Sequence, residues 1–181
     1  MTSCPSPVPL ATPACVCFPD QFPPNRQEKL VLQLELAAPP NTQLMSVALT
    51  PVKYNFIRTY QNEQALFSYN SGSGVFTAPF SASYSFNLVF STVSVGVSAA
   101  NTLECWIYVN GKQASFTGGF LPPAVAGQTF QNYTFTNLLL QAGDSVQVLA
   151  SSALGPAYAF QTNASPTPSP MTLAISSLIE S

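Results

Sequence analysis

The stretch YNSGSGVFTAPFSASYSF, residues 69–86, joins a glycine-spaced turn, a short apolar run, a proline and then aromatic residues at alternate positions. Its glycines predict a tight turn that brings a strand back on itself, because glycine adopts positive φ angles at no steric cost. Phe76 is expected to enter the core, and Pro79 ends the pairing because it has no backbone N–H. Tyr84 and Phe86 then begin a long central strand, so this stretch predicts β structure packed around aromatic side chains.

Apolar residues alternate with polar ones in several other segments of the chain. Residues 84–90 and 103–109 show the clearest alternation, which is typical of strands that bury one face. Residues 29–36 carry leucine at every second position and are predicted as a strand, although this spacing also fits a helical turn. Strand patterns recur after the Pro39-Pro40 pair and no segment shows a long helical period, so the domain is predicted to be all-β.

Two turns between these strands can be placed from the sequence. Asn110-Gly111 predicts a type I′ hairpin that pairs residues 103–109 with 112–116, since both central residues of that turn need positive φ. Gly143-Asp144 predicts a second turn, after which Val146 and Val148 point inward. The last strand is predicted at 173–179. Three segments rich in Ser, Ala, Gly and Pro are predicted as loops: 91–102, 115–128 and 151–170.

The composition is that of a folded chain with an unusually neutral surface. Hydrophobic residues make up 46% of the 181 residues and charged residues only 7%, where roughly a quarter is typical of soluble domains. Such a surface suits a subunit that either buries much of itself in an oligomer or lives on an outer surface among its own kind. With a net charge of −2 and five scattered basic residues, the chain has no stripe that could follow phosphates, and nucleic-acid binding is not expected.

The amino-terminal segment differs from the rest of the chain. Residues 1–28 are rich in proline and cysteine and are predicted as an extended tail, residues 29–40 as either a strand or a linker, and residues 41–181 as the domain. The first ten residues lack the basic and apolar regions of a secretory signal. No run of 18 apolar residues occurs, so no membrane span is expected.

The four cysteines fall into two groups. Cys4, Cys15 and Cys17 lie in the proline-rich tail, where they would cross-link subunits or tether them to a larger body in an oxidising compartment, or remain free thiols. Cys105 alternates with apolar residues and is expected to be a buried small hydrophobe.

Catalytic and metal-binding patterns are not found in the sequence. The chain has no histidine, and its seven carboxylates are spread one at a time, so neither an acid–base pair nor a cofactor is expected. Asp144 is expected to have a structural role in its turn. Calcium binding needs several clustered carboxylates, which no single loop offers, and only a site formed by symmetry at an oligomer axis is left open.

The order of motifs around residues 69–86 resembles the complement component 1q and tumour necrosis factor superfamily. The resemblance extends over about residues 44–179, where 46–49 is similar to the family's first strand. It departs from the family at Ala82, where glycine is usual, and in the last strand. The matching positions are Tyr69, Asn70, Gly74, Phe76, Thr77, Ala78, Pro79, Tyr84 and Phe86, followed by Asn110-Gly111 and Gly143-Asp144.

This resemblance implies a ten-stranded jelly roll that forms a homotrimer. Four aromatic residues are then candidates either for the three-fold contact or for the ordinary core of one subunit: Tyr54, Phe56, Tyr84 and Phe86. Four more, in predicted loops, are candidates for ligand contact, with anchoring of the loop ends to the core as the alternative: Phe116, Phe120, Tyr158 and Phe160.

The function that fits these features is a non-enzymatic, trimeric head displayed on the outer surface of a particle such as a virion or spore. Its tail would attach it to that scaffold, and its apical loops would bind a host receptor or a glycan. The alternative is a structural coat or cement protein that recognises no ligand. Its partners would be further copies of the chain and the scaffold in both cases.

Overall fold

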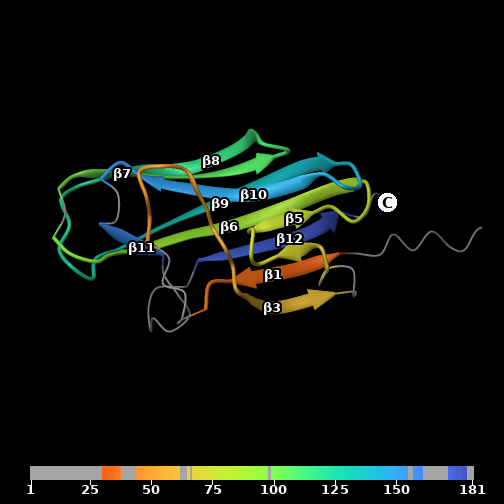
Figure 1. Cartoon of the computed structure of the whole chain (residues 1–181), viewed down its shortest axis with the longest axis horizontal. Coiled ribbons are helices and arrows are strands. Elements are labelled where there is room, and N and C mark those ends of the chain that lie inside the picture. The colour runs from red at the N-terminus through yellow and green to blue at the C-terminus, as the bar shows by residue number, and fades with distance from the viewer. Residues whose placement is uncertain are drawn as a thin grey trace, which may run out of the picture.

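Two six-stranded antiparallel sheets face each other in the computed structural model (Figure 1). The structure describes residues 30–37, 44–61, 65, 67–97, 99–154, 157–160 and 171–178. Sheet A contains β1 (Val31–Glu35), β3 (Phe56–Gln61), β6 (Ala82–Ser94), β9 (Thr129–Leu140), β11 (Tyr158–Phe160) and β12 (Thr172–Leu178). Sheet B contains β2 (Thr50–Pro51), β4 (Tyr69–Asn70), β5 (Val75–Thr77), β7 (Asn101–Val109), β8 (Lys112–Leu121) and β10 (Ser145–Ser152). None of the described residues belongs to a helix with the length and apolarity needed to cross a bilayer.

The long strand β6 organises sheet A. On one side it pairs with β9 along the whole of that strand, and on the other with β12 and then β11. β1 lies between β12 and β3, so the leucine-rich segment before residue 41 is a strand of the sandwich itself. Leu30, Leu32, Leu34 and Leu36 are all fully buried, and the folded unit therefore begins before the domain boundary predicted at residue 41.

Sheet B runs in the order β4, β5, β10, β7, β8, and β2 pairs with β10. The β7–β8 hairpin turns at Asn110 (φ +49°) and Gly111 (φ +75°), as the sequence predicts. β8 and β9 are edge strands of their two sheets, and Asn132 Nδ2 donates to Gly118 O across them at 3.4 Å.

The stretch 69–86 folds as its sequence indicates. Tyr69 pairs with Phe76, and the Asn70 side-chain oxygen accepts hydrogen bonds from the backbone N–H groups of Gly72 (2.9 Å) and Ser73 (3.1 Å). Gly74 has φ +72°, and a Cβ at this position would lie only 2.7 Å from the carbonyl oxygen of Val52. The turn therefore requires glycine both for its backbone conformation and for its close approach to the neighbouring chain.

Aromatic side chains from both sheets form the centre of the core. The ring of Phe76 on β5 meets Tyr84 and Phe86 on β6 edge to face, with centroids 5.8 and 6.1 Å apart. At the other end of β6, Phe90 packs against Phe130 of β9 in the same manner, at 6.1 Å. The contacts of Phe76 join sheet B to sheet A, whereas the Phe90–Phe130 contact lies within sheet A on its inner side, and the predicted all-β sandwich is confirmed.

Several predicted boundaries are wrong. Residues 46–49 form no strand, and the first strand of the sandwich is β1, which pairs with β12 and β3. The predicted loop 115–128 begins only after Leu121, because β8 continues through Gly118, whose missing side chain lets its backbone approach the Leu103 carbonyl. Part of the predicted loop 151–170 forms β11, which pairs with the end of β6.

The two ends of the sandwich differ in what they carry. At the end that we call proximal, β1 begins beside the end of β12, and the Asn110 turn is hydrogen-bonded to Asp144 in the turn between β9 and β10. The opposite, distal end carries the connections between β6 and β7, between β8 and β9, and after β10. The first described residue and the last therefore lie at the same, proximal end.

Candidate interaction surfaces

The charged groups of the described residues lie apart from one another. Glu35 is on the outward side of sheet A and forms an ion pair with Arg58 at 3.7 Å, whereas Glu104 is on the outward side of sheet B. Asp144 lies in the proximal turn. No group of three His, Cys, Asp or Glu side chains that could hold a metal ion occurs among the described residues.

Asp144 connects the two proximal turns. Its carboxylate accepts hydrogen bonds from Asn110 Nδ2 and from the backbone N–H of Gln141, each at 2.8 Å. These donors favour the charged carboxylate, so they hold the pKa of Asp144 below its usual value. The Asn110 side-chain oxygen in turn accepts from Ser145 N at 2.9 Å. This arrangement has the structural role that the sequence predicts for Asp144.

The outward side of sheet A, which we call the sheet A face, is broad and nearly neutral. Three large side chains of the edge strand β9 project from it, with exposed fractions of 63% for Tyr133, 66% for Phe135 and 74% for Leu139. Phe135 on β9 is paired with Asn87 on β6, which is paired on its other side with Ala174 on β12. Small and uncharged residues therefore occupy the centre of the sheet A face. Among the described residues of this face, the charges are those of the Glu35–Arg58 pair near β3.

The aromatic candidates for a three-fold contact separate in the structure. Tyr54, Tyr84 and Phe86 are each at most 1% exposed and belong to the core of the single chain. Phe56 is 46% exposed and lies opposite Glu35, at the β3 edge of the sheet A face. Tyr133, Phe135 and Leu139 were missed as surface residues, although their spacing in TFQNYTFTNLLL places them on one side of a strand.

The aromatic ligand candidates separate in the same way. Tyr158 and Phe160 belong to β11 and are 1% and 2% exposed, so they anchor the distal end to the core and cannot meet a ligand. Phe116 and Phe120 lie on strand β8 rather than in a loop, and both are exposed on the outward side of sheet B. The large hydrophobic side chains exposed in the described distal connections are aliphatic: Val95, Val97, Val125 and Leu154.

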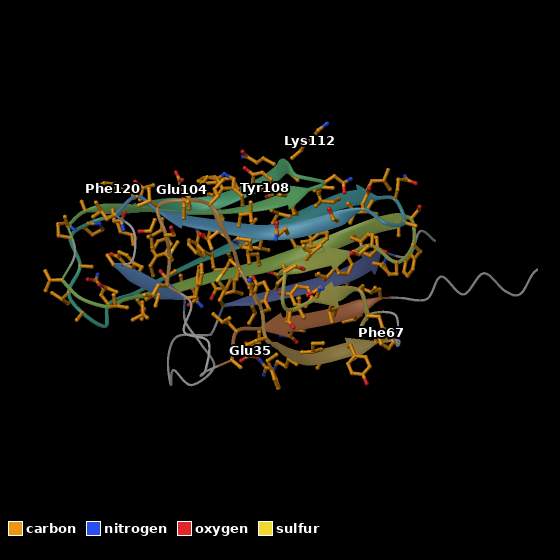
Figure 2. The ribbon with its side chains drawn as sticks, in the orientation of Figure 1. Glu35, Phe67, Glu104, Tyr108, Lys112 and Phe120 are labelled. Atoms are coloured by element: carbon orange, nitrogen blue, oxygen red, sulfur yellow. The ribbon has the colours of Figure 1, made fainter. Side chains whose placement is uncertain are left out.

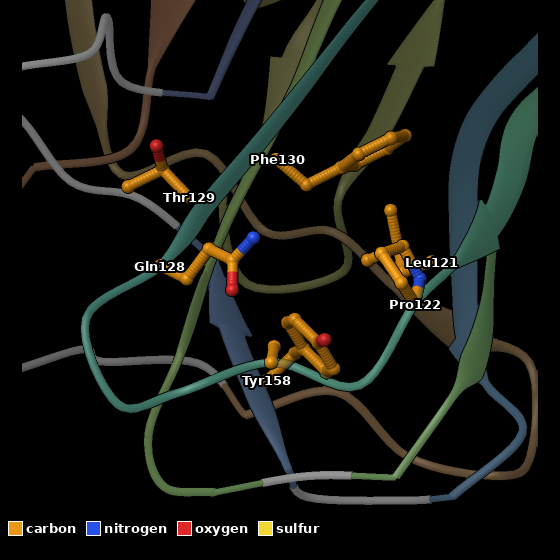
Figure 3. Close-up of a pocket in the computed structure, with 7 residues that line it drawn as sticks. Leu121, Pro122, Gln128, Thr129, Phe130 and Tyr158 are labelled. Carbon is orange, nitrogen blue, oxygen red and sulfur yellow. The ribbon is translucent and has the colours of Figure 1, made fainter.

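A small pocket lies at the distal end, beside the connection between β8 and β9 (Figure 3). Leu121, Pro122, Phe130 and Tyr158 are among the residues that line it. Its volume of about 20 Å³ is enough for a single water molecule and too small for an organic ligand.

The cysteines of the tail, Cys4, Cys15 and Cys17, lie outside the described residues, as does the predicted tail itself. Cys105 is a free thiol with no exposed surface, as expected from its sequence pattern. Burial raises the pKa of this thiol above its ordinary value.

Comparison with known proteins identifies the fold. No family model matches the sequence, and no curated protein matches it. Three solved structures that resemble the chain are the globular domain of the zebrafish complement 1qA protein, murine APRIL and the Eiger TNF of S. frugiperda.

Their TM-scores are 0.53, 0.58 and 0.54, their sequence identities 14%, 13% and 9%. The alignments cover 83%, 83% and 86% of this chain and 98%, 99% and 96% of the respective structures. The chain therefore has the jelly roll fold of complement 1q and tumour necrosis factor domains. The ten strands predicted become twelve among the described residues because short strands such as β2 are counted separately.

Proposed function

We propose that the chain is the non-enzymatic head of a surface-displayed protein, and that three copies assemble through the sheet A face. The N-terminal tail attaches the assembly to a particle such as a virion or spore, and the head binds a receptor or glycan. The observation that carries this proposal is the sheet A face, which is broad, almost uncharged and bordered by exposed aromatic and aliphatic side chains.

The sheet A face would leave apolar side chains exposed to water if the chain stayed a monomer. Contiguous exposed apolar side chains on a soluble protein mark interaction sites, and the cores of subunit interfaces are depleted in charged residues. Phe135 and Leu139 are exposed by 66% and 74%, and the residues that follow Phe135 across the sheet, Asn87 on β6 and Ala174 on β12, are small. The resemblance to complement 1q and tumour necrosis factor domains favours three copies.

Recognition by the distal end is favoured by the place where β1 begins and by the position of the connecting loops. β1 begins at the proximal end, so a tail attached there leaves the distal end facing away from the scaffold. Val97 and Val125 project from the distal connections with exposed fractions of 86% and 65%. The outward side of sheet B is also left free by an assembly that uses sheet A.

The experiment that tests the assembly is a measurement of solution mass by light scattering after size-exclusion chromatography, with and without reductant. Three chains of 19.2 kDa give about 58 kDa, and we expect this mass in both conditions. Phe135→Asp on the sheet A face should yield monomers. Phe120→Asp is the matched control, because Phe120 is similarly exposed at 71% on the opposite side of the sandwich and should leave the mass unchanged.

A wild-type monomer, or a trimer unaffected by Phe135→Asp, would refute assembly through the sheet A face. A trimer lost on reduction would assign assembly to the tail cysteines instead. Binding of the trimer to cells or glycan arrays would support recognition. Continued growth into larger arrays without such binding would support the structural coat or cement protein.

A further inference from the structure

The outward side of sheet B carries a carboxylate between aromatic side chains. Glu104 lies on β7 opposite Gly118 of β8, and the next outward-facing pair on either side is Trp106 with Phe116 and Thr102 with Phe120. We call Glu104, Trp106, Phe116 and Phe120 the Glu104 cluster. Figure 2 shows Phe120, Glu104 and Tyr108 in a row along the upper edge of the sandwich, over β7 and β8.

The aromatic members of the cluster offer ring surface on both sides of the carboxylate. The rings of Trp106 and Phe116 contact each other with centroids 5.4 Å apart and planes inclined by 51°. Phe116 is 50% exposed and Phe120 is 71% exposed, so part of each ring remains accessible to a ligand. Aromatic faces carry negative electrostatic potential, and they attract cations that approach within about 6 Å.

Glu104 forms no ion pair with any of the residues that the structure describes. No lysine or arginine of the described residues lies within ion-pair distance of it, and its contact with a polar side chain is a 3.5 Å hydrogen bond donated by Ser151 Oγ to Oε2. The carboxylate is half-buried by its neighbours. Gly118 places no side chain over it from β8, and a Cβ there would overlap the carbonyl oxygen of Leu103, so this opening is fixed by the backbone.

We infer that the Glu104 cluster binds the guanidinium group of an arginine side chain presented by a partner polypeptide. A guanidinium group pairs with a carboxylate through two parallel hydrogen bonds and stacks on aromatic faces, which are the two kinds of group that the cluster brings together. An ammonium group makes a weaker match because it is compact and strongly hydrated. This inference rests on the proposed function, because it takes the receptor bound by the head to be a protein rather than a glycan.

The cluster contains its own reporter, because Trp106 is the single tryptophan of the chain. Titration of the full-length protein with Nα-acetyl-arginine methylamide, followed by tryptophan fluorescence at constant ionic strength, measures binding at this position. We expect a saturable change. The neutral control is Nα-acetyl-citrulline methylamide, which has nearly the same shape and no charge and should give no saturable change.

Two variants and one matched control locate the binding. Glu104→Gln keeps the shape of the side chain and removes its charge, and it should weaken arginine binding at least about tenfold. Phe120→Ala should weaken it several-fold through the loss of one ring. Phe67→Ala removes an exposed ring (86%) outside the Glu104 cluster and should leave the titration unchanged.

Equal responses to the arginine and citrulline probes would overturn the inference, as would an unchanged titration of Glu104→Gln or the absence of any response at 100 mM probe. Its failure is distinguishable from failure of the proposed function. A trimer that binds cells equally well with and without the Glu104→Gln substitution would retain the function and exclude this site.

Discussion

Replacement of Gly74 by alanine tests whether the turn in the stretch 69–86 needs glycine for space as well as for backbone conformation. Gly74 has φ +72°, and its added Cβ would lie 2.7 Å from the carbonyl oxygen of Val52. Gly111 is the matched control, because it has a nearly identical φ of +75° but nothing within 4 Å of its added Cβ. The two variants share the conformational strain and differ in the steric overlap.

The expected free energies follow from these two terms. A left-handed conformation costs alanine about 1–2 kcal/mol, and the reduced entropy of the unfolded chain returns about 0.4–1 kcal/mol, so Gly111→Ala should lower the free energy of unfolding by about 1 kcal/mol. Gly74→Ala adds the overlap with a backbone oxygen, and forcing extra atoms into a packed site costs about 1–3 kcal/mol. Gly74→Ala should therefore be less stable than Gly111→Ala by about 2 kcal/mol.

Equilibrium unfolding in urea measures this difference. Both variants should be compared at one protein concentration and with the same association state by light scattering, because assembly shifts apparent stability. The reasoning is refuted if the free energies of unfolding of the two variants agree to within about 0.5 kcal/mol, the variation expected of an unconstrained surface change.

Three further predictions concern single polar groups. Hydrogen bonds lower the pKa of Asp144 in the folded protein, so its carboxylate contributes stability at pH values above its unfolded pKa of about 4. That contribution is lost as the pH falls through the lower folded pKa. Thermal unfolding of Asp144→Asn should therefore depend less on pH below about 4 than thermal unfolding of the wild type. Cys105 should resist iodoacetamide at pH 8 in the folded protein and react in urea, as peptide mass spectrometry would show; modification of the folded chain would contradict its burial. The Tyr54 hydroxyl is buried and has no hydrogen-bond partner among the described residues, so Tyr54→Phe should raise the free energy of unfolding measured with urea by up to about 1 kcal/mol. A loss of more than about 1 kcal/mol would reveal a partner for that group.

Local sequence rules predicted the parts of the fold whose determinants are close together in the chain. The Asn110-Gly111 hairpin and the turn around Gly74 need positive φ, which the sequence signals by glycine and asparagine. The alternation in 103–109 predicted the burial of Cys105, because successive strand residues face opposite sides.

The misassigned segments depend on distant partners. β11 is three residues long and exists because it pairs with the end of β6, more than sixty positions earlier, so the burial of Tyr158 and Phe160 could not be read from their serine- and proline-rich surroundings. For the same reason, alternation identified aromatic residues on strands without showing which side faces the second sheet. Tyr84 and Phe86 face inward, whereas Phe135 faces outward.

The position of β1 bears on how the domain would carry mechanical load. This strand lies between β12 and β3, and its first residue is at the proximal end, directly after the tail. A pull on the tail, against a partner held at the distal end, acts along the strand axis. The hydrogen bonds to both neighbouring strands run across that axis. They therefore resist in shear and share the force, whereas an edge strand pulled sideways would open one bond at a time.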